Sequence, residues 1–545
     1  MSEFKHQAGM LWAGALALAF LWCLVPGEVR AATPAQSQAD NRGGTDETGA
    51  PFDIWEYQVK GNTLLPTEDI ERAVYGHLGP HKTIDDVEAA RKQLEKLYQD
   101  RGYGTVFVDI PEQDVSGGVV TLKVTEGQVE RLRVTGSRYF SLGRIKARVP
   151  SLAKGKVPHL PEVQKELAAL NSSTPDRVIT PVLRPGLTPG KVEVELKVKD
   201  ELPLHGSLDI NDRYTADTTR LRLNGTLRYD NLWQREHSIS VSYQVSPQDP
   251  GEVEVFSGTY LLKSPFSDHL LALYGVSSST DVATIGTLGV IGSGVIGGAR
   301  YIIPLRSLDN YFHSVTLGAD YKDFSESIAL QGSDSLNTPI SYLMFATQYA
   351  GTWLTEGATT HLNIGVNFAL RGLGNTQKEF ENKRFNADPN FVYLRAGFDR
   401  VQPLFRDASL FVRLQGQVAN SPLISNEQFS AGGVDSVRGY LESQVLADDG
   451  MDGTLELRSS SLADYISPRL NQLKMLAFVD GAAMRVRQAL PSQASAYYLW
   501  SAGVGLKLTA LKNLKAALFW AWPFETAGST LAGDSRLHFD LGYEF

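Results

Sequence analysis

The chain has 545 residues, of which 42% are hydrophobic and 21% are charged, and its formal net charge at pH 7 is -9. That length allows several domains, or small domains attached to one large closed sheet. The acidic balance argues against broad, non-specific binding to nucleic acid, so nucleic acid is not an expected partner.

Residues 1–31 are predicted to be a secretory signal peptide. Lys5 gives a weakly basic start, and an almost continuous apolar run extends from Met10 to Val25. This run is shorter than the roughly 20 residues that a membrane-spanning helix needs, and the residues up to Ala31 suit cleavage after that position. Cys23 is the only cysteine, so we expect neither thiol catalysis nor a thiolate metal site in the mature chain.

Residues 32–52 are rich in Gly, Ser, Thr, Pro and Gln, which predicts a flexible linker. The part over 33–50 has no apolar stripe, so no stable helix that could plug a pore is expected there.

Residues 53–127 are predicted to form a first small domain with the order β-α-α-β-β, in which Thr67 is expected to cap the first helix. The expected elements are a strand over 55–59, helices over 68–75 and 84–99, and strands over 106–110 and 120–124.

Residues 128–200 repeat this plan less regularly. Clean alternation of valine and leucine with lysine and glutamate predicts the last strand of the unit. The expected elements are a strand over 129–134, helices over 142–149 and 161–170, and strands over 178–183 and 192–198.

These two units resemble POTRA domains, the polypeptide-transport-associated modules of outer-membrane translocation proteins. The resemblance implies periplasmic modules that contact a polypeptide in transit, while a generic α+β domain is the alternative. It rests on the element order and on four motifs, namely Val59-x-Gly61-Asn62, Tyr98-x-x-x-Gly102-Tyr103, Ile110-Pro111-Glu112-Gln113, and Gly118-Val119-Val120 leading to Glu126-Gly127.

Residues 201–545 are predicted to form a transmembrane β-barrel of about 16 antiparallel strands, with no helix among them. Polar and apolar residues alternate in segments of roughly ten residues, the length that a tilted strand needs to cross a bilayer. In the last segment, charged side chains alternate with Leu537, Phe539 and Leu541. A soluble sandwich also alternates, but charged polar faces opposite aromatic apolar faces favour a barrel, whose sheet must close in lipid.

The longest irregular stretch of the predicted barrel, about 419–450, contains Val437, Arg438, Gly439 and Tyr440 in sequence. This tetrapeptide resembles the signature of the long sixth extracellular loop in the outer-membrane assembly and secretion superfamily. The resemblance implies a loop that folds back into the lumen, where its arginine pairs with an inward aspartate. An ordinary surface arginine in a glycine-rich loop is the alternative.

The matching strand is expected over 473–481, where Phe478-Val479-Asp480 resembles the Phe-x-Asp motif of that superfamily. Asp480 and Phe478 share one face, and the charge of Asp480 requires that this face be the lumen. The resemblance therefore implies a latch between Arg438 and Asp480. A guanidinium and a carboxylate suit this role because their bidentate pairing fixes orientation as well as distance.

The chain ends in Phe545, which follows Tyr543 on the same face of an alternating segment. A terminal aromatic residue of this kind resembles the signal by which outer-membrane proteins are recognised for insertion. It implies outer-membrane lipid and the barrel-assembly machinery as partners during biogenesis.

A barrel of this superfamily with two POTRA-like units resembles TpsB, the transporter of two-partner secretion, of the haemolysin-activator and filamentous-haemagglutinin type. The resemblance implies that the periplasmic units capture a large unfolded exoprotein, whose activity as a haemolysin, adhesin or toxin stays open, and that the barrel conducts it outward. An insertase of the barrel-assembly type and a passive porin are the alternatives.

No nucleophile, clustered acid–base pair or metal-ligand spacing stands out, so neither enzymatic activity nor a cofactor is expected.

Overall fold

The computed structural model describes residues 51–264, 267–280, 282–285, 288–325, 327–329, 335–491 and 493–545. The predicted signal peptide (1–31) and the linker segment up to residue 50, including the expected absence of a plug helix over 33–50, lie outside the described residues. Within the described ranges, no helix combines the length and the apolar character needed to cross a membrane.

The first α+β domain contains a three-stranded sheet in the order β2-β5-β4, with β2 and β5 parallel. Its strands and helices follow the predicted order. They are β1 (Phe52–Ile54), β2 (Glu56–Lys60), α2 (Thr67–Val74), η1 (Tyr75–His77), β3 (Gly79–Lys82), α3 (Ile84–Asp100), β4 (Val106–Asp109) and β5 (Val119–Glu126).

Two details of this domain differ from the prediction. Pro66 is the N-cap of α2 in an extended conformation, and no side chain caps the helix, so the expected cap at Thr67 was wrong. Proline favours the extended conformation here, which moves Thr67 into the first turn. The small sheet formed by β1 and β3 was not predicted, because Gly79–Lys82 has no apolar alternation.

The second α+β domain contains a sheet in the order β6-β8-β7, in which β6 and β8 are parallel and β7 and β8 are antiparallel. Val163, Leu167 and Leu170 lie buried in its core, on the helix face that the sequence predicted. The elements are β6 (Gln128–Thr135), α4 (Leu142–Ala147), η2 (Pro150–Leu152), α5 (Leu160–Ser172), β7 (Arg177–Pro185) and β8 (Lys191–Asp200).

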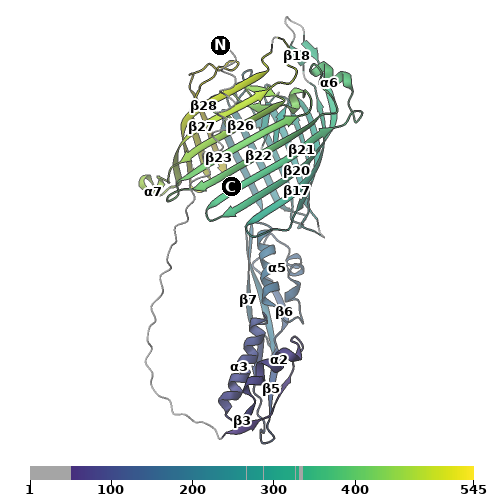
Figure 1. Cartoon of the computed structure of the whole chain (residues 1–545), viewed down its shortest axis with the longest axis vertical. Coiled ribbons are helices and arrows are strands. Elements are labelled where there is room, and N and C mark those ends of the chain that lie inside the picture. The colour runs from purple at the N-terminus through teal and green to yellow at the C-terminus, as the bar shows by residue number, and fades with distance from the viewer. Residues whose placement is uncertain are drawn as a thin grey trace, which may run out of the picture. The chain divides into compact units, whose positions relative to one another are not determined.

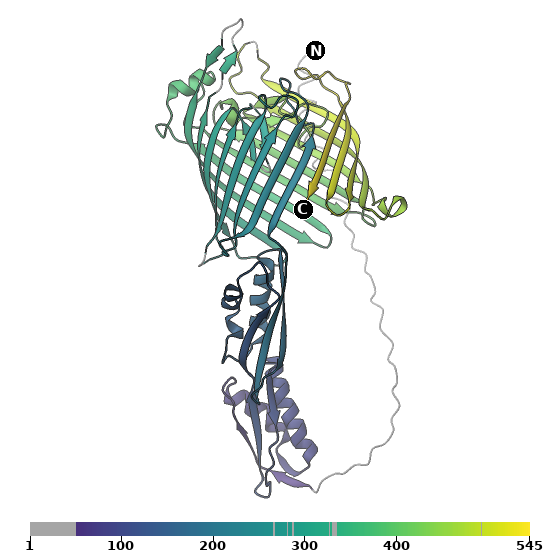
Figure 2. The same cartoon turned by 180° about the vertical axis from the view of Figure 1, so that it is seen from behind.

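The rest of the chain forms one closed barrel of 16 antiparallel strands, as predicted. Its strands run strongly tilted (Figure 1), and the last strand pairs with the first, which Figure 2 shows as blue strands beside yellow ones. The strands are β9 (Leu204–Asn211), β10 (Arg222–Leu232), β11 (His237–Val245), β12 (Glu254–Lys263), β13 (Leu270–Ser278), β16 (Gly294–Pro304), β17 (Tyr311–Phe324), β20 (Ile340–Thr355), β21 (Ala358–Ala369), β22 (Val392–Pro403), β23 (Ser409–Ala419), β26 (Asp449–Arg458), β27 (Leu470–Arg485), β28 (Ala496–Ala510), β29 (Leu514–Pro523) and β30 (Arg536–Glu544).

The two faces of the barrel wall follow the alternation of the sequence. Large apolar side chains such as Leu227, Val241 and Leu317 are exposed on the outer face, where lipid would cover them. On β27, Met475, Ala477 and Val479 are likewise exposed, whereas Leu476 and Phe478, which alternate with them, are buried. The alternation therefore identifies the lumen face of each strand.

The expectation that this region contains no helix was wrong. Helices α6 (Gln377–Lys383) and α7 (Ala463–Ile466) lie in connections near opposite rims of the barrel (Figure 1). Helix α6 begins with a capping box formed by Thr376 and Glu379, a local signal that is independent of the alternation of the strands. Short hairpins also extend from the barrel, formed by β14 (Val282–Ile285) with β15 (Leu288–Ile291) and by β18 (Ser327–Ala329) with β19 (Ser335–Asn337).

Candidate functional site

The stretch between β23 and β26, residues 420–448, is called here the lumen loop. It contains η3 (Ser425–Glu427) and a short antiparallel hairpin of β24 (Phe429–Ala431) and β25 (Val445–Ala447). Although it connects two strands of a barrel, most of its residues are buried. The loop therefore packs against other parts of the protein instead of extending into solvent.

The tip of the lumen loop brings Arg438 and Asp480 together. Arg438 Nε donates to Asp480 Oδ2 at 2.7 Å, and Nη2 donates to Oδ1 at 2.9 Å. The backbone N–H of Arg438 donates to the same carboxylate at 3.1 Å. Both side chains are buried, with 4% and 0% of their surface exposed, so the pair has the bidentate geometry that fixes an arginine in place.

A second carboxylate, which sequence analysis missed, completes this site. Arg438 Nη1 donates to Glu456 Oε2 at 2.6 Å. The other oxygen of Glu456 accepts from Lys507 Nζ at 2.9 Å and from Arg458 Nε at 2.7 Å. Alternation in β26 could have placed Glu456 in the lumen, but only the register that pairs Glu456 with Phe478 of β27 brings it to the loop.

Two aromatic rings enclose the guanidinium of Arg438. Its Cζ lies 3.4 Å from the ring centroid of Phe478 and 5.2 Å from that of Phe519. Phe478 was predicted from the Phe-x-Asp motif, whereas Phe519 comes from β29, which the motif does not reach. The face of an aromatic ring attracts a cation, so the rings add to the binding of Arg438 while they exclude water.

The residues next to Arg438 in the chain are also buried or hydrogen-bonded to the barrel. Val437 is fully buried, and the Tyr440 hydroxyl donates to the backbone oxygen of Glu525 at 2.8 Å. Gly439 has a φ of +93°, and its N–H donates to His538 Nε2 at 3.0 Å. Because a side chain is strained at that φ, this position favours glycine. Each member of the predicted tetrapeptide is thus either buried in the core of the loop or held by hydrogen bonds.

The first arm of the lumen loop has a separate anchor at Glu427, which sequence analysis did not identify. Glu427 is 1% exposed. Its Oε1 accepts from Lys322 Nζ and from the Tyr342 hydroxyl, both at 2.5 Å, and its Oε2 accepts from the Tyr393 hydroxyl at 2.7 Å. These donors belong to β17, β20 and β22, so this anchor lies on a part of the wall other than the strands that hold Arg438.

The second arm is fixed where it returns to the wall. Asp448 is fully buried and accepts from Arg384 Nη1 at 2.5 Å and Nη2 at 2.7 Å. The backbone N–H groups of Leu423 and Arg487 donate to the same carboxylate, each at 2.7 Å. Three buried carboxylate centres, at Glu427, Asp448 and the Arg438 pair, therefore hold the loop along its length.

The two residues of the predicted insertion signal lie at the closure of the barrel. Tyr543 pairs with Leu208 of β9, and Phe545 exchanges backbone hydrogen bonds of 2.9 Å with Gly206. The rings of Tyr543 and Phe545 are both exposed on the outer face. An insertion role for these residues stays a prediction.

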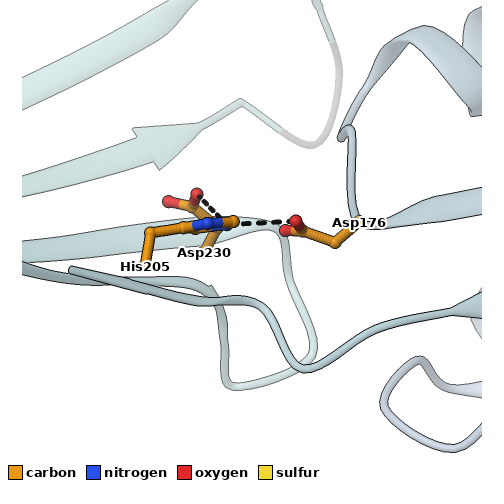
Figure 3. A group of neighbouring side chains, drawn as sticks. All are labelled: Asp176, His205 and Asp230. Atoms are coloured by element: carbon orange, nitrogen blue, oxygen red, sulfur yellow. Dashed lines mark ion pairs between the residues drawn. The ribbon is translucent and has the colours of Figure 1, made fainter. Parts of the chain in front are cut away.

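One group outside the loop has metal-ligand chemistry. Asp176, His205 and Asp230 place one ligand atom each within 4.8 Å of the others, and Figure 3 shows the His205 ring between the two carboxylates. His205 Nε2 lies 3.0 Å from Asp176 Oδ1 and 3.5 Å from Asp230 Oδ2. Asp230 also pairs with Arg228 Nε at 2.9 Å, so we interpret this group as a cluster of polar contacts that joins β9 and β10 to the loop before β7.

Two protein-family descriptions match parts of the chain. The family described as POTRA domain, ShlB-type, matches residues 52–127. The family described as haemolysin secretion/activation protein ShlB/FhaC/HecB matches residues 340–508, a range that includes the whole lumen loop together with Glu456 and Asp480.

Curated relatives and solved structures cover most of the chain. The outer membrane transporter CdiB of Dickeya dadantii is 23% identical over 505 residues, covering 87% of this chain and 83% of that protein. The heme/hemopexin transporter protein HuxB of Haemophilus influenzae is 18% identical over 414 residues, covering 74% and 71%. The structure of CdiB from Escherichia coli superposes with a TM-score of 0.59 at 21% identity, covering 94% and 93%, which shows a shared fold.

Proposed function

Since this chain belongs to the TpsB family of two-partner secretion transporters, which move a partner exoprotein across the outer membrane, we propose how its parts divide that work. The barrel lies in the outer membrane, and its POTRA domain lies in the periplasm. The observation that carries the proposal is the buried Arg438, held by two carboxylates on the lumen wall of a closed barrel. The relatives found are transporters, so an insertase or a passive porin is not favoured.

The two α+β domains are proposed to capture the unfolded exoprotein, and the second is proposed to be a POTRA domain like the first. In each sheet the outer strands pair on one side only, so an extended chain can add to the free edge by backbone hydrogen bonding. Strand β7 contains Pro181 and Pro185, which lack N–H donors, whereas β2 and β6 contain no proline. Strand β4 is also an outer strand without proline, so we expect substrate at β2, β4 or β6.

The lumen loop is proposed to regulate the width of the conduit. Its tip is fixed by Arg438 to β26 and β27, and its first arm is fixed by Glu427 to β17, β20 and β22. A buried charge that loses its partner is strongly destabilising, so each anchor strongly favours the folded loop. Both anchors together keep the loop across the lumen and limit the passage of solutes.

The proposed function is tested by comparing the proteins released by cells with and without the gene for this transporter. The exported protein is defined as the polypeptide that disappears from the supernatant and the cell surface when the gene is deleted. We expect one very long chain to behave in this way and to return when the gene is restored. Unchanged release of every polypeptide would refute the secretion function.

Glu427→Ala is expected to increase the single-channel conductance of the purified barrel. The substitution removes the carboxylate that accepts from the ammonium of Lys322 and from two tyrosine hydroxyls, and loss of one partner of a buried ion pair costs roughly 3–5 kcal/mol. The first arm should then detach from the wall and widen the lumen. Conductance in planar bilayers, together with sensitivity of cells to a large antibiotic, measures the effect.

Asp388→Ala is the matched control for Glu427. Asp388 pairs with Arg371 at 3.4 Å, but both side chains are about half exposed, at 41% and 52%. Exposed ion pairs contribute only about 0–1 kcal/mol, so conductance should stay near that of the native protein. Equal increases in the two variants would mean that Glu427 does not hold the loop in any specific way.

A further inference from the structure

One section of the lumen wall carries a continuous patch of small hydroxyl side chains, called here the hydroxyl track. The register aligns Thr226 of β10 with Ser207 of β9 and with Ser242 of β11, and it aligns Ser242 with Ser257 of β12. Two residues further along the strands, on the same face, Ser240 of β11 pairs with Thr259 of β12. The six members of the track are Ser207, Thr226, Ser240, Ser242, Ser257 and Thr259.

The alternation of the strands shows that the track faces the lumen. Its members lie between exposed apolar side chains of the outer face, such as Leu227, Val241 and Phe256. Thr259 is exposed and the other five are half-buried, although none points toward lipid, so water in the lumen reaches them. Thr226 and Ser242 are joined by a hydrogen bond of 2.9 Å.

The track differs in charge from the wall that holds the loop tip. None of its six side chains is ionisable, although Arg228 lies opposite Ser240 and Glu544 lies opposite Ser207 at its periplasmic end. The wall that holds the loop tip instead carries buried charges, because β26, β27 and β28 contribute Glu456, Asp480 and Lys507 to the lumen. The tip and the first arm make their buried contacts on those strands, on β30 through His538, and on β17, β20 and β22. Among the residues that the structure describes, hydrogen bonds and ion pairs of the lumen loop do not involve any member of the track.

The track also begins close to the periplasmic end of the barrel. Ser207, Thr226 and Ser240 line a cavity there, and its other lining residues include the charged Arg228, Lys512 and Glu544. An exoprotein segment that arrives from the periplasm can therefore reach the first hydroxyl groups of the track, which lie near the C-terminal strand of the transporter.

We propose that the hydroxyl track is the surface along which an extended segment of the unfolded exoprotein passes while the lumen loop stays folded. This inference rests on the proposed secretion function. The backbone of every barrel strand is already paired, so a passing chain can be bound only by side chains of the wall. Hydroxyl groups both donate and accept, which lets them pair with any backbone N–H or C=O regardless of sequence.

The chemistry of the track also allows the chain to leave. Conduction requires binding that is favourable enough for entry and weak enough for release. Single hydroxyl hydrogen bonds exchange readily with water, and small side chains leave room for large residues of the passing segment. A wall of fixed charges would instead retain segments of opposite charge and repel those of like charge.

The first test places lysine in the track by the double substitution Ser242→Lys and Ser257→Lys. We expect release of the exported protein to fall by about tenfold at matched surface abundance, equivalent to roughly 1.4 kcal/mol on the barrier. Gln348→Lys is the control, because Gln348 lies on the lumen face of β20, on the same side as Tyr342 and Met344. Release of the exported protein by this variant should stay within about twofold of the native level. This corresponds to a change of less than roughly 0.4 kcal/mol in the barrier.

The conservative pair Ser242→Thr and Ser257→Thr keeps both hydroxyl groups and should secrete like the native protein. Equal losses in the track and Gln348 variants would overturn the proposal, because added charge anywhere in the lumen would then explain them. Native release from the double lysine variant would also overturn it, while the secretion function would stand. Absence of any exported protein refutes the secretion function itself, which is a different failure.

A second measurement applies if the lysine variants do not assemble. Ser242→Cys and Gln348→Cys are compared, since Cys23 is the only native cysteine and lies in the expected signal peptide. A membrane-impermeant methanethiosulfonate with a quaternary ammonium group labels the thiol in cells with and without the exported protein. Labelling at position 242 should slow only when that protein is in transit, and equal labelling rates in both cells would contradict the proposal.

Discussion

Arg438→Ala is expected to lower release of the exported protein at least about tenfold at matched surface abundance, and Asp480→Ala is expected to lower it less. The difference follows from Glu456. Without Arg438, the fully buried Asp480 loses the cation that the structure pairs with it. Without Asp480, Arg438 still has Glu456 at 2.6 Å. A released loop tip would lose its fixed position in the lumen and would disturb the path that the exoprotein follows beside the folded loop.

The double variant of Arg438 and Asp480 should be no worse than Arg438→Ala alone. Both substitutions disrupt the same contact, and the second also removes the carboxylate that the first leaves unpaired. The measurement is a double-mutant cycle on release, with the amount of folded barrel determined by its heat-modifiable migration on gels. Strictly additive losses would mean that the two residues act independently and that the loop is held by other contacts.

Arg485→Ala is the control for this cycle. Arg485 lies at the end of β27, the strand that carries Asp480, and pairs with Asp449 at 2.9 Å. Its side chain is 62% exposed, so the pair should contribute at most about 1 kcal/mol. Native release from this variant would show that loss of an arginine from this strand region is not by itself harmful.

Deleting residues 53–127 is expected to abolish release of the exported protein while a heat-modifiable barrel still reaches the outer membrane. The deletion removes the POTRA domain, including the free edges of β2 and β4, two of the strands at which we expect substrate to add. The barrel closes through pairing of β9 with β30, and neither strand lies in the deleted range. Release is measured by immunoblot of the supernatant and the cell surface.

Deleting residues 33–50 is the matched control, because it also shortens the N-terminal region but keeps both α+β domains. Release and conductance should change little, since this sequence has no apolar stripe that would form a stable helix. Normal release after deletion of 53–127 would contradict substrate capture by the POTRA domain. A large rise in conductance after deletion of 33–50 would show that this segment occupies the lumen.

The sequence by itself determined the features that depend on local patterns. Polar and apolar side chains alternate along each strand, and successive side chains point to opposite sides, so the alternation distinguishes the lumen face from the lipid face. That rule correctly placed Phe478 and Asp480 on the lumen face, and the closure of the barrel followed from the backbone's need for partners in lipid. The tetrapeptide that begins at Val437 identified Arg438 as the arginine of the latch, and this identification rested on resemblance alone.

Only the tertiary structure decided which residues complete the site. Glu456 reaches Arg438 because the register of β26 against β27 sets it opposite Phe478, and alternation does not determine register. Glu427 receives its partners from strands that lie 34 to 105 residues away in the chain. The hydroxyl track likewise becomes one surface only when β9 to β12 align side by side. Contacts between strands depend on how the sheet assembles, and no local pattern in the sequence encodes that arrangement.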